Sequence, residues 1–98
     1  MVNEISIHTS GIYLLNEEEK KKLDTLLGRY HQKVQRHFND KIFLELHVKE
    51  YNKEGSRKKF SLHANLHGAT GKIEADAYDW ELTRTLHKVM RKLLEETG

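Results

Sequence analysis

The chain has 98 residues, of which 37% are hydrophobic and 33% are charged, and its formal net charge at pH 7 is +2. This length fits one domain, so we expect residues 1–98 to fold as a single unit. The absence of cysteine excludes disulfides and thiolate metal sites and favours a cytoplasmic location. No signal peptide and no run of about 18 apolar residues is visible, so the sequence predicts neither secretion nor a membrane span.

The first two predicted elements are a strand and a long helix. Residues 4–9 alternate between apolar and polar side chains, which predicts a strand. Asn16 and Glu19 have the spacing of a capping box, so we expect a helix to begin there. Its apolar residues recur at steps of three and four and predict a buried stripe, which consists of Leu23, Leu27, Tyr30, Val34 and Phe38.

Three further segments have the period of two that is typical of strands: residues 42–49, 60–67 and 72–77. Residues 52–57 contain Gly55 and predict a hairpin loop, and residues 67–71 predict a second turn. Asp79 is a candidate cap for a final helix, whose apolar line consists of Leu82, Leu86, Val89 and Leu93.

The predicted fold class is α+β with the element order β-α-β-β-β-α. Each strand has one apolar face and each helix one apolar stripe, so both helices should pack on one face of a four-stranded mixed sheet. The first two strands, joined by a helix, should be parallel. This arrangement is similar to that of a double-stranded RNA-binding domain.

Basic residues form two rows at helical spacing. We call the row on the first helix the first basic ridge; it consists of Lys22, Arg29, Lys33 and Arg36. The second basic ridge, on the last helix, consists of Arg84, Lys88 and Arg91, with Lys92 nearby. The loop residues Arg57, Lys58 and Lys59 add more positive charge. We expect both ridges to be free of acids and to merge into one surface that binds a phosphate backbone.

A solvated helix face is the alternative explanation for either ridge alone, because amphipathic helices commonly carry Lys and Arg outside. The aromatic residues argue against stacking on single-stranded bases, since Tyr30, Phe38 and Phe60 are predicted to be in the core. Phe43, Tyr51 and Tyr78 are left outside. Recognition of the RNA backbone is therefore expected rather than recognition of bases.

The element order, together with the segments "KKLDTLLGRY", "IFLELHV" and "IEADAYDWELTRTLHKVMRKLLEE", resembles the ribosome hibernation promoting factor family, also known as ribosome-associated inhibitors or sigma-54 modulation proteins. The feature most similar to the family is a strand ending in Ala75 and Ala77, followed by an acid, an aromatic residue and an amphipathic helix. The chain departs from the family's frequent Ala-Ile-Asp at the start of this helix, and Met90 stands among its later basic residues where the family often has Gln.

The resemblance implies binding to RNA of the small ribosomal subunit, in the decoding region where tRNA and mRNA would lie, and silencing of idle ribosomes by steric occlusion. It implies that the basic residues of the two ridges contact ribosomal RNA. Because the chain stops at Gly98, it resembles a short form that lacks the second domain of long members. We expect a monomer away from the ribosome, with no cofactor, no membrane partner and no small-molecule substrate.

Competing hypotheses come from the sheet. His47, His63 and His67 are predicted on the face away from the helices, where three imidazoles could bind zinc. Alternation instead places His63 beside Asp76 or His47, as expected of cross-strand pairs, and no HExxH spacing is present. This face could also dock a protein. A double-stranded RNA-binding domain is a further rival, disfavoured by the extra first strand.

No pattern for catalysis is visible in the sequence. Ser10, Ser56 and Ser61 lack the glycines of a nucleophile elbow, and Gly68 and Gly71 lie between strands rather than before a helix. We therefore expect a protein that is not an enzyme.

Overall fold

The computed structural model describes residues 5–36, 42–55, 57–68 and 71–97. Its elements are, in chain order, β1 (Ile5–Ser10), the 3-10 helix η1 (Ile12–Leu14), α1 (Glu17–Arg36), β2 (Ile42–Glu54), β3 (Arg57–Gly68), β4 (Gly71–Asp79) and α2 (Leu82–Thr97). This is the predicted order with one short 3-10 helix added.

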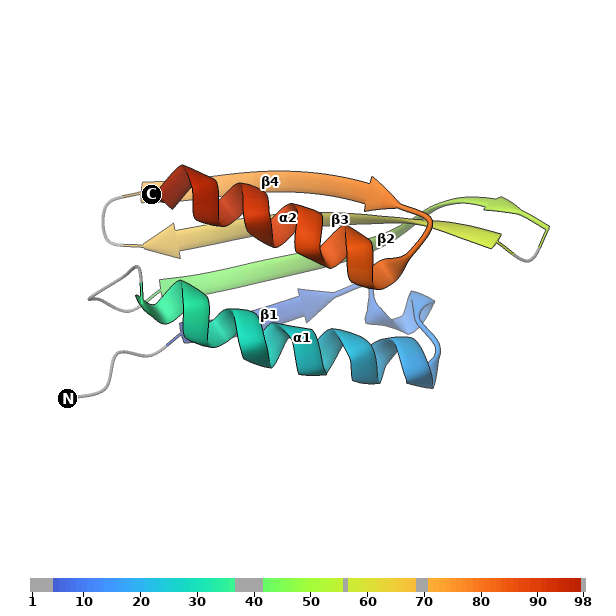
Figure 1. The fold of residues 1–98 in the computed structure, drawn as a ribbon, viewed down its shortest axis with the longest axis horizontal. Coiled ribbons are helices and arrows are strands. Elements are labelled where there is room, and N and C mark those ends of the chain that lie inside the picture. The colour runs from blue at the N-terminus through green and yellow to red at the C-terminus, as the bar shows by residue number, and fades with distance from the viewer. Residues whose placement is uncertain (1–4, 37–41, 56, 69–70, 98) are drawn as a thin grey trace.

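The four strands form one sheet in the spatial order β1-β2-β3-β4. β1 is parallel to β2, whereas β3 is antiparallel to both β2 and β4. Both helices cover the same face of the sheet and run side by side in the same direction, and the opposite face, which we call the open face, is left uncovered by helices (Figure 1). The predicted α+β architecture is confirmed.

The core lies between the sheet and the two helices. Alternate strand residues are buried, and they are Ile42, Leu44, Leu46, Val48, Phe60, Leu62, Ala64, Leu66, Ala75 and Ala77. The apolar lines of the two helices are buried against them as predicted, joined by Leu26 and Met90. Phe38, predicted for the same stripe, lies outside the described residues. Since one sheet face supplies this core, the other is free for polar side chains.

The predicted capping box opens α1. The Glu19 backbone N–H donates to Asn16 Oδ1 at 2.8 Å, and the Asn16 backbone N–H donates to Glu19 Oε1 at 2.9 Å. Two backbone donors that the helix cannot satisfy internally are thereby paired. The start of α1, and with it the position of the first basic ridge, is fixed locally by these two residues.

Gly11 makes the tight connection between β1 and α1 possible. Its φ is +75°, and a Cβ atom built there would lie 2.0 Å from the Val48 carbonyl oxygen. No side chain fits at that distance, so the passage of the chain over β2 requires glycine. The 3-10 helix that follows was not predicted, because three residues are too few to show a period.

The hairpin between β2 and β3 is longer than predicted. Most of the expected loop, residues 52–57, belongs to the strands, and the pairing of Glu54 with Arg57 extends the ladder to a turn at Gly55. A shift of register separates Glu50 from Asn52. Polar residues continue the ladder through backbone hydrogen bonds, so the apolar alternation that identifies a strand is missing here.

Asp79 does not cap α2 in the predicted way. It is the last residue of β4, and α2 begins at Leu82. Its carboxylate accepts a hydrogen bond from the Glu81 backbone N–H at 3.2 Å, ahead of the first helical residue. The side chain therefore organises the strand-to-helix turn rather than the first helical turn, and its second oxygen, Oδ2, is left to accept from Lys88 of α2.

Candidate nucleic-acid interface

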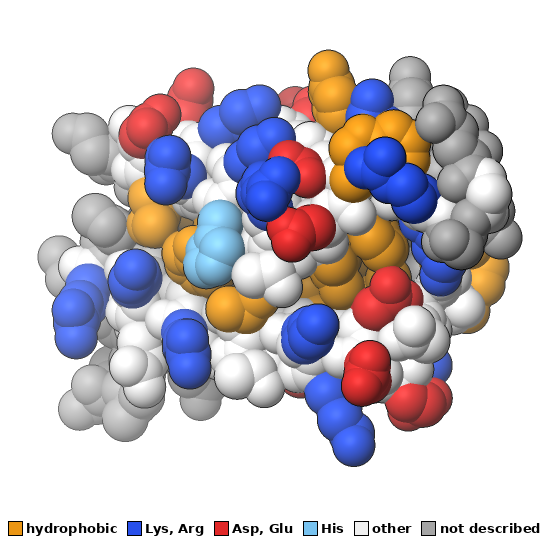
Figure 2. Space-filling model, turned by 45° about the vertical axis from the view of Figure 1, so that its right-hand side comes forward, with side chains coloured by type: hydrophobic (Ala, Val, Ile, Leu, Met, Phe, Trp, Pro, Cys, Tyr) orange, Lys and Arg blue, Asp and Glu red, His pale blue; other side chains and the backbone are white. Residues whose placement is uncertain are grey.

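The first basic ridge projects from α1 as the sequence predicts. Lys22, Arg29, Lys33 and Arg36 are all exposed. Within the described ranges, none of the four forms an ion pair with an acid. Their charges are available to a ligand, and Figure 2 shows Lys and Arg side chains spread along this helix face.

The second basic ridge is partly neutralised. Arg84 lies 2.8 Å from a Glu81 carboxylate oxygen and 3.4 Å from Asp79, and Lys88 Nζ lies 2.8 Å from the other Asp79 oxygen. The hydrogen bond from Lys88 holds the pKa of the Asp79 carboxyl below its usual value. Carboxylates are visible among the basic side chains in Figure 2. The prediction that no acid lies among these basic residues is therefore wrong.

Two basic side chains of α2 reach toward β4 rather than toward α1. Lys88 Nζ donates to the Tyr78 carbonyl oxygen at 3.3 Å, and Lys92 Nζ donates to the Asp76 carbonyl oxygen at 2.6 Å. Both bonds draw positive charge to the edge of the sheet. Arg91 is the residue of the second ridge for which the described chain shows no acidic partner, and the merging of the two ridges into one phosphate-binding surface stays a prediction.

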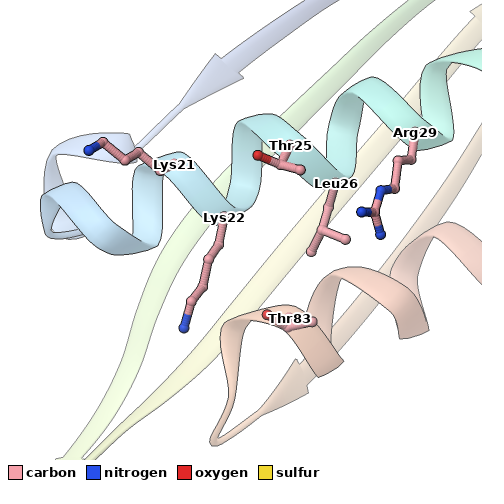
Figure 3. A pocket seen from close by; sticks show the side chains of 6 residues that line it. All are labelled: Lys21, Lys22, Thr25, Leu26, Arg29 and Thr83. Atoms are coloured by element: carbon pink, nitrogen blue, oxygen red, sulfur yellow. The ribbon is translucent and has the colours of Figure 1, made fainter.

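A hollow of about 350 Å³ lies between the N-terminal halves of α1 and α2. We call it the helix groove; its lining is Lys21, Lys22, Thr25, Leu26, Arg29 and Thr83. In Figure 3 the side chains of Lys22, Leu26 and Arg29 point from α1 toward α2. The positive charge of the groove comes from α1 alone, because α2 contributes only Thr83 to the lining.

Tyr30 and His87 continue the contact between the helices. Tyr30 Oη and His87 Nδ1 form a hydrogen bond, and Lys33 Nζ lies 5.3 Å from the centre of the Tyr30 ring. Burial raises the pKa of the Tyr30 hydroxyl, against a smaller opposite effect of the Arg91 charge. The phenol therefore keeps its proton at neutral pH and can donate it to the imidazole, so this bond links α1 to α2 without a charged partner.

The basic residues at the start of β3 contact aromatic rings of their own chain. The Arg57 guanidinium lies 4.5 Å from the centre of the Trp80 ring, and Lys59 Nζ lies 4.4 Å from that of Tyr78. Cation–π contacts of this kind hold the strand against the turn between β4 and α2. These residues were predicted to bind RNA, and the structure gives them a structural contact as well.

Lys58, the third member of this group, lies 3.8 Å from Glu19, the residue that caps α1. Both side chains are largely buried by their surroundings, and the pair ties β3 to the beginning of α1. The group formed by residues 57–59 therefore lies at the end of the helix pair where both helices begin.

Histidines on the open face pair across strands, as predicted. His63 Nδ1 lies 2.5 Å from Asp76, and this hydrogen bond raises the pKa of the imidazole. His67 Nε2 lies 2.9 Å from Glu45. Among the described residues, no group of three or more histidine or acidic side chains is placed to hold a metal ion. In that same part of the chain, no helix is long and apolar enough to cross a membrane.

Comparison with known proteins identifies the fold. No protein-family model matches the chain, and no curated protein matches it. A ribosomal subunit interface protein from Coxiella burnetii has a similar structure, with a TM-score of 0.59 and 20% identity over 95% of this chain and 91% of that chain. The N-terminal domain of Protein Y from Thermus thermophilus has a TM-score of 0.58 and 13% identity, covering 98% of this chain and 96% of that chain. At such low identity the likeness establishes a shared fold, and at that level it confirms the predicted resemblance.

Two residues of the helix groove were not predicted from the sequence. Leu26 and Thr83 line the helix groove, and neither has a charge that would have drawn attention. The ion pair of Arg84 with Glu81 could have been predicted from the sequence, because Glu81 precedes Arg84 by three residues, the spacing of neighbours on a helix surface. The contacts of Asp79 with Lys88 and of Lys92 with β4 depend on how α2 folds back over the strand.

Proposed function

We propose that the chain is a ribosome-associated translation inhibitor of the hibernation promoting factor type, which binds RNA of the small subunit through α1 and the helix groove and does not act as an enzyme. The observation that carries this proposal is the first basic ridge, four exposed basic residues with no acidic partner in the described structure. The fold shared with a ribosomal subunit interface protein supports the ribosome as the partner.

The mode of binding follows from the type of charge. Lys and Arg side chains neutralise phosphates and release condensed counterions, so affinity depends on salt and little on base sequence. Beyond the lining of the groove, His87 and Arg91 of α2 and Lys33 of α1 lie near Tyr30, so polar and basic side chains of both helices continue past it. A phosphate backbone lying along the groove would therefore meet donors from both helices, with α1 supplying most of the charge.

The bound protein would inhibit translation by steric occlusion of the channel for tRNA and mRNA. A folded molecule with extents of 49 × 23 × 17 Å would exclude tRNA and mRNA from the space that it occupies on the subunit. No bond is made or broken in this mechanism, which agrees with the lack of a catalytic pattern in the sequence. Silencing would be reversible, because salt-sensitive contacts release when competing ligands bind the subunit.

The proposal is tested by sedimentation of the purified protein with separated small and large ribosomal subunits. We expect association with the small subunit, and we expect tRNA together with mRNA to compete with it. Lys22→Gln/Arg29→Gln should abolish most of this association. A matched control, Lys20→Gln/Lys49→Gln, removes the same charge from side chains outside the first basic ridge and should retain it. Equal loss in both double variants, or association with the large subunit alone, would contradict the proposal.

A further inference from the structure

The open face of the sheet carries a row of three rings. His8 and Phe43 stack with their ring centres 6.5 Å apart and their planes 24° apart, and the centres of Phe43 and His67 are 5.9 Å apart. We call these three residues the ring row. They come from β1, β2 and β3, so the row crosses three neighbouring strands of the sheet.

Phe43 is the centre of this row and is exposed over 40% of its surface. Its neighbours along β2, Leu44 and Ile42, are buried on the other side of the sheet, so nothing in the core requires an aromatic ring at this position. A large apolar ring held in a polar surface between two imidazoles is arranged for a flat ligand. The π-faces of nucleic-acid bases are such ligands, and stacking on aromatic rings is how four-stranded sheets commonly bind unpaired RNA.

The charges around the row are compatible with RNA. Glu45, the carboxylate next to the row on β2, is paired with His67 at 2.9 Å. Lys72 lies on β4 directly across from His67; its Nζ is 3.9 Å from Glu74, and half of its side chain is exposed, within reach of a phosphate that follows a base stacked on the row. A protein partner fits less well, because the centre of a protein interface is apolar and low in charge. The ring row instead has a single exposed phenylalanine surrounded by histidines and ion pairs.

From these contacts we propose that the open face is a second RNA-binding surface, on which the unpaired bases of a single strand stack over the ring row. This inference goes beyond the proposed function, since it concerns the side of the molecule opposite the helix groove. It also revises the expectation that too few aromatic residues remain outside the core for stacking. That expectation counted Phe43 without the two imidazole rings that the sheet register places beside it.

The test is fluorescence anisotropy with a short labelled oligoadenosine and with a strand of the same length that carries abasic sugars. The two probes have the same phosphates and differ in their bases. We expect Phe43→Leu to weaken binding of the oligoadenosine by roughly 5- to 100-fold, because it removes a stacking ring. The abasic strand should bind wild type and Phe43→Leu alike. Tyr13→Leu is the matched control, since this ring is 82% exposed but lies in η1, away from the open face.

Three outcomes would overturn the inference: no binding of the oligoadenosine to wild type, the same affinity in Phe43→Leu and wild type, or the same loss in Tyr13→Leu. Thermal unfolding of each variant shows whether the fold is retained. Lys22→Gln/Arg29→Gln separates the two surfaces, because it should weaken association with small subunits and leave the preference for base-bearing over abasic strands unchanged. Loss of that preference in this variant would place stacking on the helices and contradict the inference.

Discussion

The two helices carry similar rows of basic residues, but only the row on α2 is paired with acids in the described residues. On α1 the first basic ridge projects into solvent with no acidic partner in the described residues, whereas Arg84 and Lys88 on α2 are held by Asp79 and Glu81. The difference arises at the beginnings of the helices. Glu19, at the start of α1, is committed to the capping box, while Asp79 and Glu81 precede α2 with carboxylates directed at its basic residues. Spacing alone therefore does not establish a phosphate-binding surface.

The largest expected effect on affinity comes from removing positive charge from α1. The variant Lys22→Gln/Arg29→Gln/Lys33→Gln should bind small subunits roughly 100-fold more weakly at about 0.1 M salt, because each lost phosphate contact removes most of one unit from the salt slope. Its free energy of unfolding should change by less than about 0.5 kcal/mol per site, since exposed side chains are replaced. Filter binding and urea unfolding measure the two quantities.

The corresponding variant of α2, Arg84→Gln/Lys88→Gln/Arg91→Gln, compares the contribution of α2 to small-subunit affinity with that of α1. It should lose about tenfold in affinity, mainly through Arg91, because the other two charges are already paired. Equal losses of affinity in the two triple variants would show that the helices contribute alike, and would contradict the leading role of α1.

Asp79→Asn should separate stability from binding. The variant keeps the shape of the side chain but loses the charge that holds Lys88 and Arg84, which should cost about 1–2 kcal/mol of stability at neutral pH. The released basic residues should tighten RNA binding about fivefold. Tighter binding by a less stable protein is the distinguishing result, and weaker binding would mean that Asp79 positions basic residues for RNA.

The same substitution has a pH signature. Because the folded-state pKa of Asp79 is lowered, its ionised form stabilises the protein above the unfolded-state pKa of about 3.9, and this contribution is lost as the pH falls through the folded-state value. The difference in unfolding free energy between wild type and Asp79→Asn should therefore shrink in acid. A difference that stays constant down to the acid limit would exclude the charge as its cause.

Glu81→Gln tests the exposed member of this pair of acids. Its contact with Arg84 joins two exposed side chains, so stability should change by less than about 0.5 kcal/mol. Affinity for small subunits should rise about twofold as Arg84 is released. Isothermal titration of both proteins under one salt condition measures the change, with Glu96→Gln as a control for the same charge removed at the other end of α2.

Gly28→Ala should leave RNA affinity unchanged while stabilising α1. A Cβ atom there meets nothing within 4 Å, and the residue lies in the middle of an exposed helix face. Alanine in place of glycine stabilises such a position by about 0.5–1 kcal/mol. If binding followed helix stability rather than charge, this variant would bind more tightly, which calorimetry would reveal.

Most of the fold could be predicted because its determinants are local. The alternation in β2, β3 and β4 and the capping box of Asn16 and Glu19 each require only neighbouring residues, and the structure confirms them. Gly11 was not singled out, since its need for a positive φ depends on the carbonyl oxygen of Val48, a residue far along the chain. The extension of the hairpin past Asn52 was also missed. The strands there pair through backbone hydrogen bonds, and their polar residues show no alternation of apolar side chains.

The candidate site was predictable in part. The exposure of the first basic ridge follows from its position beside the apolar stripe, and α1 carries it as predicted. The direction of Lys88 and Lys92 could not be read from the helix alone, because their acceptors are carbonyl oxygens of β4. The ring row likewise depends on the register of three strands, which brings His8 and His67 to either side of Phe43.

The salt dependence of binding to small subunits tests the role of α1 most directly. Wild type and Lys22→Gln/Arg29→Gln/Lys33→Gln would be titrated with subunits over a series of monovalent salt concentrations. We predict a steep linear fall of log affinity with log salt for wild type, and a slope smaller by about 2 to 3 in the variant, one step of about 0.7 to 0.9 for each basic residue removed. Parallel slopes in the two proteins would show that α1 does not contact phosphates, and would contradict the proposed mode of binding.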